Sequence, residues 1–250
     1  MELSAYLVIL VAVVIGSVVK GATGTGLPTV AIPVMAGFLG VETAVVLMAV
    51  PTVVTNSWLM WIHRSQIGAT RDLPVMLGAG FLGVVAGAWL LTSVSGDVLA
   101  LVLAGLIAVY VTLSLTRPSL AFPPHVTRYV SPPVGFAGGL LQGSTGIAGP
   151  AVATYVHGFR LPPGAYVFTL ATQFQLFALV SVVTYHQFGL YTAERMWWSV
   201  LVLPPMLLAM SVGVRLGRRL ERRVFDRFVL AVLGVMGVRL VVDALDLWPW

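Results

Sequence analysis

Charged residues divide this 250-residue chain into long apolar stretches, which limit its fold more than any other feature. A helix that crosses a membrane needs about 20 mostly apolar residues. Stretches of roughly this length or longer without Asp, Glu, Lys or Arg cover residues 3–19, 21–41, 43–63, 73–96, 98–116, 129–159, 161–193 and 196–214. Their apolar residues are continuous rather than alternating, which favours helices over the strands of a β-barrel. The sequence therefore predicts an all-α membrane protein with several crossings.

The composition excludes several classes of protein. Charged residues make up 9% of the chain and hydrophobic residues 58%, whereas soluble domains carry about 25% charged residues. A soluble enzyme, a nucleic-acid-binding module and a disordered protein are therefore excluded. The chain has no cysteine, and no pair of its histidines has the spacing of a metal site, so we expect no metal or other cofactor. A nucleophile, a base and an orienting acid cannot be assembled, so we do not expect an enzyme.

The positions of the glycines, prolines and charges predict where the helices begin and end. The expected helices cover residues 3–20, 27–39, 42–62, 73–92, 97–116, 131–142, 148–158, 163–186, 196–214 and 224–243. The prolines of the segment 116–133 predict that this segment is not helical.

An internal duplication relates the two halves of the chain. The segment GSVVKGATGTGLPTVA (16–31) aligns with GGLLQGSTGIAGPAVA (138–153) at a constant offset. The matched residues are Gly16 with Gly138, Gly21 with Gly143, Thr23 with Thr145, Gly24 with Gly146, Pro28 with Pro150 and Ala31 with Ala153. We expect residues 1–120 and 131–250 to form two membrane repeats of four parts each, joined by a linker at 121–130.

The arginines predict the orientation of the chain in the membrane. The loop 215–227 holds six of them, and the positive-inside rule places it in the cytoplasm. With both termini outside, eleven arginines face the cytoplasm and only Arg195 faces out. This assignment requires each glycine-rich segment to return the chain to its starting side, as a re-entrant hairpin or as two crossings. The halves are then inverted relative to each other, a plan typical of transporters whose site lies at broken helices near the midplane.

The glycine-rich segments do not match a phosphate-binding loop, because neither has Lys-Ser/Thr after its second glycine. A better interpretation is that the glycines end one helix and Pro28 and Pro150 begin the next. The start of a helix presents free N–H groups and a partial positive charge, which together form an anion site. The candidate anion-binding residues are Gly21, Thr23, Gly24, Thr25 and Gly26 in the first segment and Gln142, Gly143, Ser144, Thr145 and Gly146 in the second.

Lys20 is the only lysine, and it lies at the tip of the first predicted break, aligned with Gln142. A lysine at the bilayer centre costs about 2.5–3.5 kcal/mol on insertion scales, and a bound anion would offset that cost. The alternative is that the first helix spans fully and Lys20 reaches an interface. The remaining polar candidates, which either line the same cavity or bond neighbouring helices, are Asn56, Gln173 and Gln175.

Other glycines are expected to serve helix packing alone. Pairs four residues apart let the backbones of neighbouring helices approach closely. These pairs are Gly83 with Gly87, Gly139 with Gly143 and Gly213 with Gly217. Gly143 thus belongs both to a packing pair and to a candidate site.

The duplicated break, GATGTGLPTVAIPVM and GSTGIAGPAVATYV, resembles the TauE/SafE sulfite exporter family over nearly the whole chain. The length, the two four-part halves and the basic loop before the last helix are also similar. The resemblance implies a carrier of the bacterial cytoplasmic membrane for small sulfur-containing anions such as sulfite or organosulfonates, commonly outward. The family's motif positions are carried by Gly21, Thr23, Gly24, Gly26, Pro28, Gly143, Thr145, Gly146 and Pro150. Ala148 departs from the pattern, because it stands where the first copy has Gly26.

We therefore expect a secondary transporter that works by alternating access, with the anion at the paired starts of two half-helices. A passive anion channel and a membrane scaffold without a solute are the alternatives. The chain has no ATP-binding motif, so an ion gradient or the gradient of the substrate must drive transport, and a proton is the expected coupling ion. The expected partners are the anion and the lipid bilayer, with no nucleic acid, and the sequence leaves the oligomeric state open.

Overall fold

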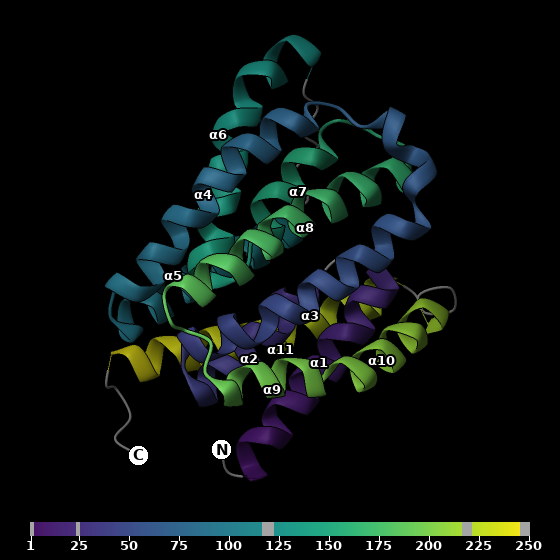
Figure 1. Cartoon of the computed structure of the whole chain (residues 1–250). Coiled ribbons are helices and arrows are strands. Elements are labelled where there is room, and N and C mark those ends of the chain that lie inside the picture. The colour runs from purple at the N-terminus through teal and green to yellow at the C-terminus, as the bar shows by residue number, and fades with distance from the viewer. Residues whose placement is uncertain (1–2, 24–25, 117–122, 217–221, 246–250) are drawn as a thin grey trace. The chain divides into compact units, whose positions relative to one another are not determined.

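The computed structural model describes residues 3–23, 26–116, 123–216 and 222–245, and every regular element within these ranges is a helix (Figure 1). The α-helices are α1 (Leu3–Thr23), α2 (Leu27–Leu39), α3 (Val41–Ile62), α4 (Leu73–Ser93), α5 (Gly96–Thr116), α6 (Pro124–Thr145), α7 (Gly149–His157), α8 (Pro163–Gln187), α9 (Ala193–Leu201), α10 (Leu203–Leu216) and α11 (Arg222–Ala244). A 3₁₀ helix, η1 (Arg64–Ala69), joins α3 to α4. The predicted all-α fold is confirmed.

Six helical segments of the described chain are long and apolar enough to cross a membrane. They are Ser4–Ala22, Val41–Ile62, Leu73–Ser93, Gly96–Leu113, Pro163–Gln187 and Ala193–Leu216. The apolar helix α2 is shorter, with 13 residues. The protein is therefore a multi-pass membrane protein, as its sequence predicts.

The start of α6 differs most from the prediction. The helix begins at Pro124, so residues 124–133 are helical and the prediction of a non-helical segment there was wrong. Pro124 lies in the first turn, where the missing N–H needs no partner. Pro132 and Pro133 lie inside the helix and leave the carbonyl groups of Arg128 and Tyr129 without helical donors. Both of these residues are exposed, so their carbonyl groups can bond to water or lipid head groups and the helix continues.

The single helix predicted over 196–214 is divided in two. α9 ends at Leu201 and α10 begins at Leu203. Pro204 and Pro205 follow directly, and neither has an N–H to donate back to the preceding turn. The hydrogen bond from the Met206 N–H to the Val202 carbonyl, at 3.0 Å, resumes the helical pattern. The two prolines therefore interrupt one apolar span without ending it.

Both glycine-rich breaks are present, but each begins about one turn later than predicted. α1 continues to Thr23, so Lys20 lies inside the helix and the prediction that it lies at the tip was wrong. α6 likewise continues to Thr145. The alignment that matches the two glycine segments also matches the helix ends, Thr23 with Thr145, and the helix starts, Leu27 with Gly149. The duplication in sequence is therefore also a duplication of local structure.

The helices form two compact units, each containing helices from both sequence repeats. Unit 1 comprises Met1–Pro51, Val94–Thr116 and Tyr191–Trp250, and unit 2 comprises Thr52–Ser93 and Arg117–Leu190. Unit 1 thus combines α1, α2 and α5 with α9, α10 and α11, whereas unit 2 combines α4 with α6, α7 and α8. The division into repeats at 1–120 and 131–250 stays a prediction about the duplication.

Within unit 2, α4 and α6 run parallel along a ladder of glycines. A Cβ on Gly83 would collide with the carbonyl oxygen of Phe136, and one on Gly87 would collide with that of Leu140. From the first contact to the second, the position increases by four residues in α4 and by four residues in α6, so the two helices run in the same direction. The collisions show that the two backbones touch, which confirms the packing role predicted for this glycine pair.

Unit 1 contains a matching contact between α1 and α10. A Cβ on Gly21 would collide with the Met210 carbonyl, and one on Gly213 would collide with the Val18 carbonyl. Near the other end of α1, the ring of Tyr6 lies 4.8 Å from that of Trp198 in α9. The first span therefore runs parallel to the span formed by α9 and α10. Gly217, the predicted packing partner of Gly213, lies outside the described residues.

Candidate functional site

The first break in the chain separates α1 from α2 in unit 1. Gly26 precedes α2 with φ +107°, a left-handed conformation that favours glycine. Its carbonyl accepts the first helical hydrogen bond, from the Val30 N–H at 3.1 Å. Gly24 and Thr25 lie outside the described residues, so their predicted roles stay predictions. The chain thus turns at this glycine and starts a new helix.

Lys20 is buried in unit 1, with 3% of its surface exposed. It lies in the last turn of α1, next to Gly21, whose close contact with α10 explains why that neighbour has no side chain. The Cβ of a residue at Gly26 would lie 2.9 Å from the Val19 side chain, so the end of α1 also packs against the start of α2. The buried amine is therefore held in the last turn of α1, just before the break.

The second break in the chain separates α6 from α7 in unit 2. Gly146 has φ +69°, and its N–H donates to the Gln142 carbonyl at 2.9 Å, which closes the last turn of α6. Ala148 then precedes α7, and its carbonyl accepts from the Val152 N–H at 3.1 Å. Ile147 and Ala148 are buried. This break is therefore enclosed by protein, and the alanine departs from the glycine of the first copy without preventing the turn.

The hydroxyl groups of the second break donate to their own helix. Ser144 donates to the Leu140 carbonyl at 2.8 Å, and Thr145 donates to the Leu141 carbonyl at 2.7 Å. The Thr145 oxygen also accepts from the Ile147 N–H at 3.4 Å. Each hydroxyl has a single proton, so neither donates to an anion in this conformation. An anion at this break would be bound by backbone N–H groups, or by these hydroxyls after rotation.

Tyr185 of α8 holds the end of α6, a contact that the sequence analysis missed. Its hydroxyl donates to the Gly143 carbonyl at 2.8 Å, and its side chain is 1% exposed. A carbonyl in the last turn of a helix has no helical donor, so this tyrosine satisfies a group that would otherwise be left unpaired. The only sequence signal is a tyrosine within a stretch that has no charged residue.

The starts of α2 and α7 share one property, the absence of a side-chain cap. Neither Gly26 nor Ala148, the residue before each helix, provides a side-chain hydrogen bond to the first turn. The first N–H groups of a helix have no partner within the helix and need one from elsewhere. Leu27 is fully buried, and Ala148 is 1% exposed. Each helix start thus presents N–H donors beside a buried residue, suited to an anion or to ordered water.

The predicted polar residues of α3 and α8 all lie in unit 2. The amide of Gln173 donates to the Met76 carbonyl of α4 at 3.0 Å, and its Oε1 has no hydrogen-bond partner among the described residues. The amide of Gln175 donates to the Ser57 hydroxyl of α3 at 3.0 Å. Asn56 is buried, with 1% exposed. Both glutamines therefore bond neighbouring helices here, and their roles in binding stay predictions.

Apolar spans, two short helices after glycine-rich breaks and helix starts beside buried residues together define a polytopic α-helical membrane protein of the broken-helix kind that transporters use. The sequence profile of the family described as sulfite exporter TauE/SafE matches residues 8–240. The chain therefore belongs to the TauE/SafE sulfite exporter family, as its glycine motifs predict. Neither a search of curated proteins nor a search of solved structures gave a significant match.

Family membership establishes the general activity. Members are membrane transporters described as sulfite exporters, which agrees with the expectation of a transporter rather than an enzyme. The motif positions that the structure describes lie at the ends of α1 and α6, directly before α2 and in the first turns of α2 and α7. The family motif therefore coincides with the two helix breaks.

Proposed function

We propose that this protein is a secondary transporter that carries a small sulfur-containing anion, such as sulfite or an organosulfonate, outward across the bacterial cytoplasmic membrane. The observation that carries the proposal is the pair of helix starts beside the buried residues Leu27 and Ala148, in a chain of the sulfite exporter family. In hydrocarbon or in a dry protein interior, unpaired backbone N–H groups cost several kcal/mol each. A bound anion offsets that cost.

A buried amine near the first break supports an anionic substrate. Lys20 is the only lysine of the chain and is buried in the last turn of α1. Gln142 occupies the aligned position in unit 2 and is also buried, with 6% exposed. We propose that the amine of Lys20 and the amide of Gln142 contribute to anion binding from their respective repeats.

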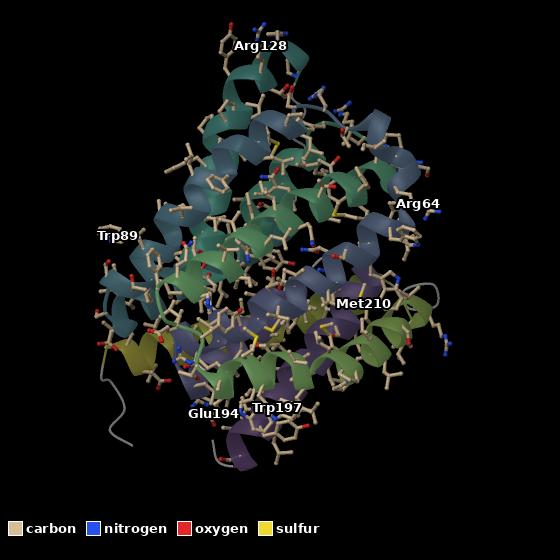
Figure 2. The ribbon with its side chains drawn as sticks, viewed as in Figure 1. Arg64, Trp89, Arg128, Glu194, Trp197 and Met210 are labelled. Carbon is tan, nitrogen blue, oxygen red and sulfur yellow. The ribbon has the colours of Figure 1, made fainter. Side chains whose placement is uncertain are left out.

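The arginines of unit 2 support the proposed orientation. Contacts between Gln66 and Gly164, between Arg71 and Phe159 and between Asp72 and Ser131 bring η1 and the adjoining ends of four helices to one end of the unit. These segments carry four arginines, Arg64, Arg71, Arg128 and Arg160. Arg128 lies at that end in Figure 2, whereas Trp89 lies toward the opposite end of α4. The positive-inside rule then makes the arginine-rich end cytoplasmic.

The mechanism we propose is alternating access between two inverted repeats. The parallel pairs α4 with α6 and α1 with α10 each join the first helix of one repeat to the fourth of the other. A conformational change that moves one repeat would therefore be transmitted to the other through glycine contacts. Transport would be driven by the gradient of the substrate or of a coupling ion, and a proton is the expected ion.

Anion-jump currents on proteoliposomes test the proposal, with sulfite, sulfoacetate, thiosulfate, sulfate and chloride applied in turn. The proposed carrier gives a current that saturates with one sulfur anion. A flux that does not saturate and needs no counterion would instead identify a passive channel. No flux of any anion, with folded protein and with isotope counterflow as a check for an electroneutral cycle, would favour a scaffold.

A further inference from the structure

In unit 2, an arginine holds the C-terminal end of the short helix α7. The guanidinium carbon of Arg71 lies 4.3 Å from the centre of the Phe159 ring. Phe159 follows α7, and its N–H donates to the Val156 carbonyl at 3.0 Å, so it continues the last turn of that helix. Its side chain is 7% exposed. A cation over an aromatic face is attracted to the ring, most strongly where water is excluded.

The residue after Arg71 holds α7 as well. Asp72 accepts a hydrogen bond from the Ser131 hydroxyl at 3.2 Å, and the oxygens of Ser131 and Tyr155 lie 2.9 Å apart. The Tyr155 ring contacts the Phe159 ring edge-on, with centroids 4.9 Å apart. Two consecutive residues before α4 therefore fix the same end of α7, one through a ring and one through a chain of hydrogen bonds.

In unit 1, a different arginine makes a similar but more exposed contact with the short helix α2, since Phe38 is 52% exposed. The guanidinium carbon of Arg239, in α11, lies 3.8 Å from the centre of the Phe38 ring near the end of α2. A Cβ on Gly37 would lie 3.2 Å from two atoms of the Arg239 side chain, so the glycine makes room for it. Asp243 lies 3.4 Å from the same guanidinium. The arginine thus lies against the last turn of the helix.

The two contacts are not copies inherited through the duplication. The residue aligned with Arg71 is Ala193, in α9, whereas Arg239 belongs to α11. Both short helices that follow a break nevertheless have, near the C-terminal end, a phenylalanine on which an arginine stacks. Helices of 9 and 13 residues are too short to be stable without tertiary contacts. A cation at the C-terminal end also opposes the partial negative charge there.

We propose that Arg71 and Arg239 are positioning residues, each of which fixes the C-terminal end of a short helix and thereby the position of its anion-binding first turn. This inference rests on the proposed function. The short helix behaves as a rigid rod, about 1.5 Å long per residue. A movement at its arginine-bound end therefore displaces the N–H groups at its other end. The arginines do not touch the anion.

The first test compares transport by Arg71→Gln and Arg239→Gln with the wild type in proteoliposomes. We expect the KM for sulfite to rise about three- to tenfold, while kcat changes less than about twofold. A rise of this size corresponds to the loss of one cation–ring contact and one charge at the helix end. Arg71→Lys keeps the charge but loses the planar stacking, so its KM should fall between those of Arg71→Gln and the wild type.

Arg64→Gln is the matched control. Arg64 also stacks on an aromatic ring, that of Trp61 at 4.4 Å, in the same unit. It belongs to η1 and contacts neither short helix through that ring. We expect its KM to equal that of the wild type. A KM raised equally in the control would overturn the inference, because the effect would then follow from any lost arginine.

The second test does not depend on transport. The chain has no cysteine, so a single Ala151→Cys in the first turn of α7 reports on that turn through its rate of reaction with a small maleimide. We expect Arg71→Gln to raise this rate and Arg64→Gln to leave it unchanged. A raised rate without any sulfite transport supports the positioning role and contradicts the proposed function. An unchanged rate, even with a lower melting temperature, overturns the positioning role.

Discussion

Gly87 of α4 and Gly143 of α6 meet where the two helices touch, and neither position has room for a side chain. A Cβ on Gly87 would collide with the Leu140 carbonyl, and one on Gly143 would collide with the Val84 carbonyl. Gly143 belongs to the duplicated family motif, yet its identity is explained by packing. Such close contacts also allow Cα–H groups to approach carbonyl oxygens of the facing helix. Part of the motif therefore holds helices together within a unit, and the rest forms the breaks.

Gly143→Ala should lower the free energy of unfolding by about 1–3 kcal/mol, because the added methyl group forces two backbones apart. Gly78→Ala, in the same α4–α6 pair, is the control, since a Cβ there meets nothing within 4 Å. Alanine is the better helix former, so the control should be neutral or stabilising by up to about 1 kcal/mol. Thermal unfolding in detergent measures both. Equal melting temperatures for the two variants would contradict the glycine contact.

Much of the fold follows from local sequence. The helix α2 has the predicted bounds, because Pro28 can begin a helix and Gly40 follows its last residue. The start of α6 could not be predicted, since whether Pro132 is tolerated depends on the exposure of the carbonyl that it frees. Short-range sequence patterns indicate the propensity of a segment to form a helix, whereas its tertiary surroundings decide whether a proline is tolerated inside that helix.

The site was predictable only in part, for a related reason. The breaks follow from glycine and proline, which act on the backbone directly. The bond from Tyr185 to Gly143 and the stacking of Arg71 on Phe159 join residues far apart in sequence. Nothing in a single sequence pairs such residues, because the pairing arises from how the helices pack.

Gly146→Ala should impair transport more than its effect on stability explains. A non-glycine residue at φ +69° costs about 1–2 kcal/mol, and relieving that strain would move the start of α7. Gly189→Ala is the control, since Gly189 has φ +71° but lies between α8 and α9, away from either break. Both variants should lose similar stability by thermal unfolding. Only Gly146→Ala should raise KM for sulfite, and an equal KM in both would be evidence against a site at the second break.

Tyr191→Phe should lower stability at neutral pH but not at high pH. The Tyr191 hydroxyl donates to the Val46 carbonyl at 3.0 Å, and burial raises the pKa of Tyr191 above its ordinary value. The folded protein therefore holds this proton more tightly than the unfolded chain does. The contribution of the Tyr191 hydroxyl to stability is thus fully present below about pH 10 and falls as the pH rises above it. We expect a loss of about 1 kcal/mol at pH 7 that shrinks above pH 10.

Unfolding of wild type and Tyr191→Phe across pH 7 to 11 measures this difference. The control is Tyr129→Phe, since Tyr129 is 77% exposed and its removal should matter little. A stability difference between wild type and Tyr191→Phe that stays constant over the whole range would show that the buried hydroxyl does not titrate as described.

The central claim, that a sulfur anion binds at the helix breaks, is tested most directly by counterflow of radiolabelled sulfite in proteoliposomes. Lys20→Gln is the informative variant, because it places in the first repeat the residue type that the second repeat has at Gln142, and Arg64→Gln serves as the control. We predict saturable counterflow in the wild type and the control, and at least a tenfold loss in Lys20→Gln with folding retained. Counterflow that is equal in all three proteins would contradict the account, because the buried lysine would then have no part in binding the anion.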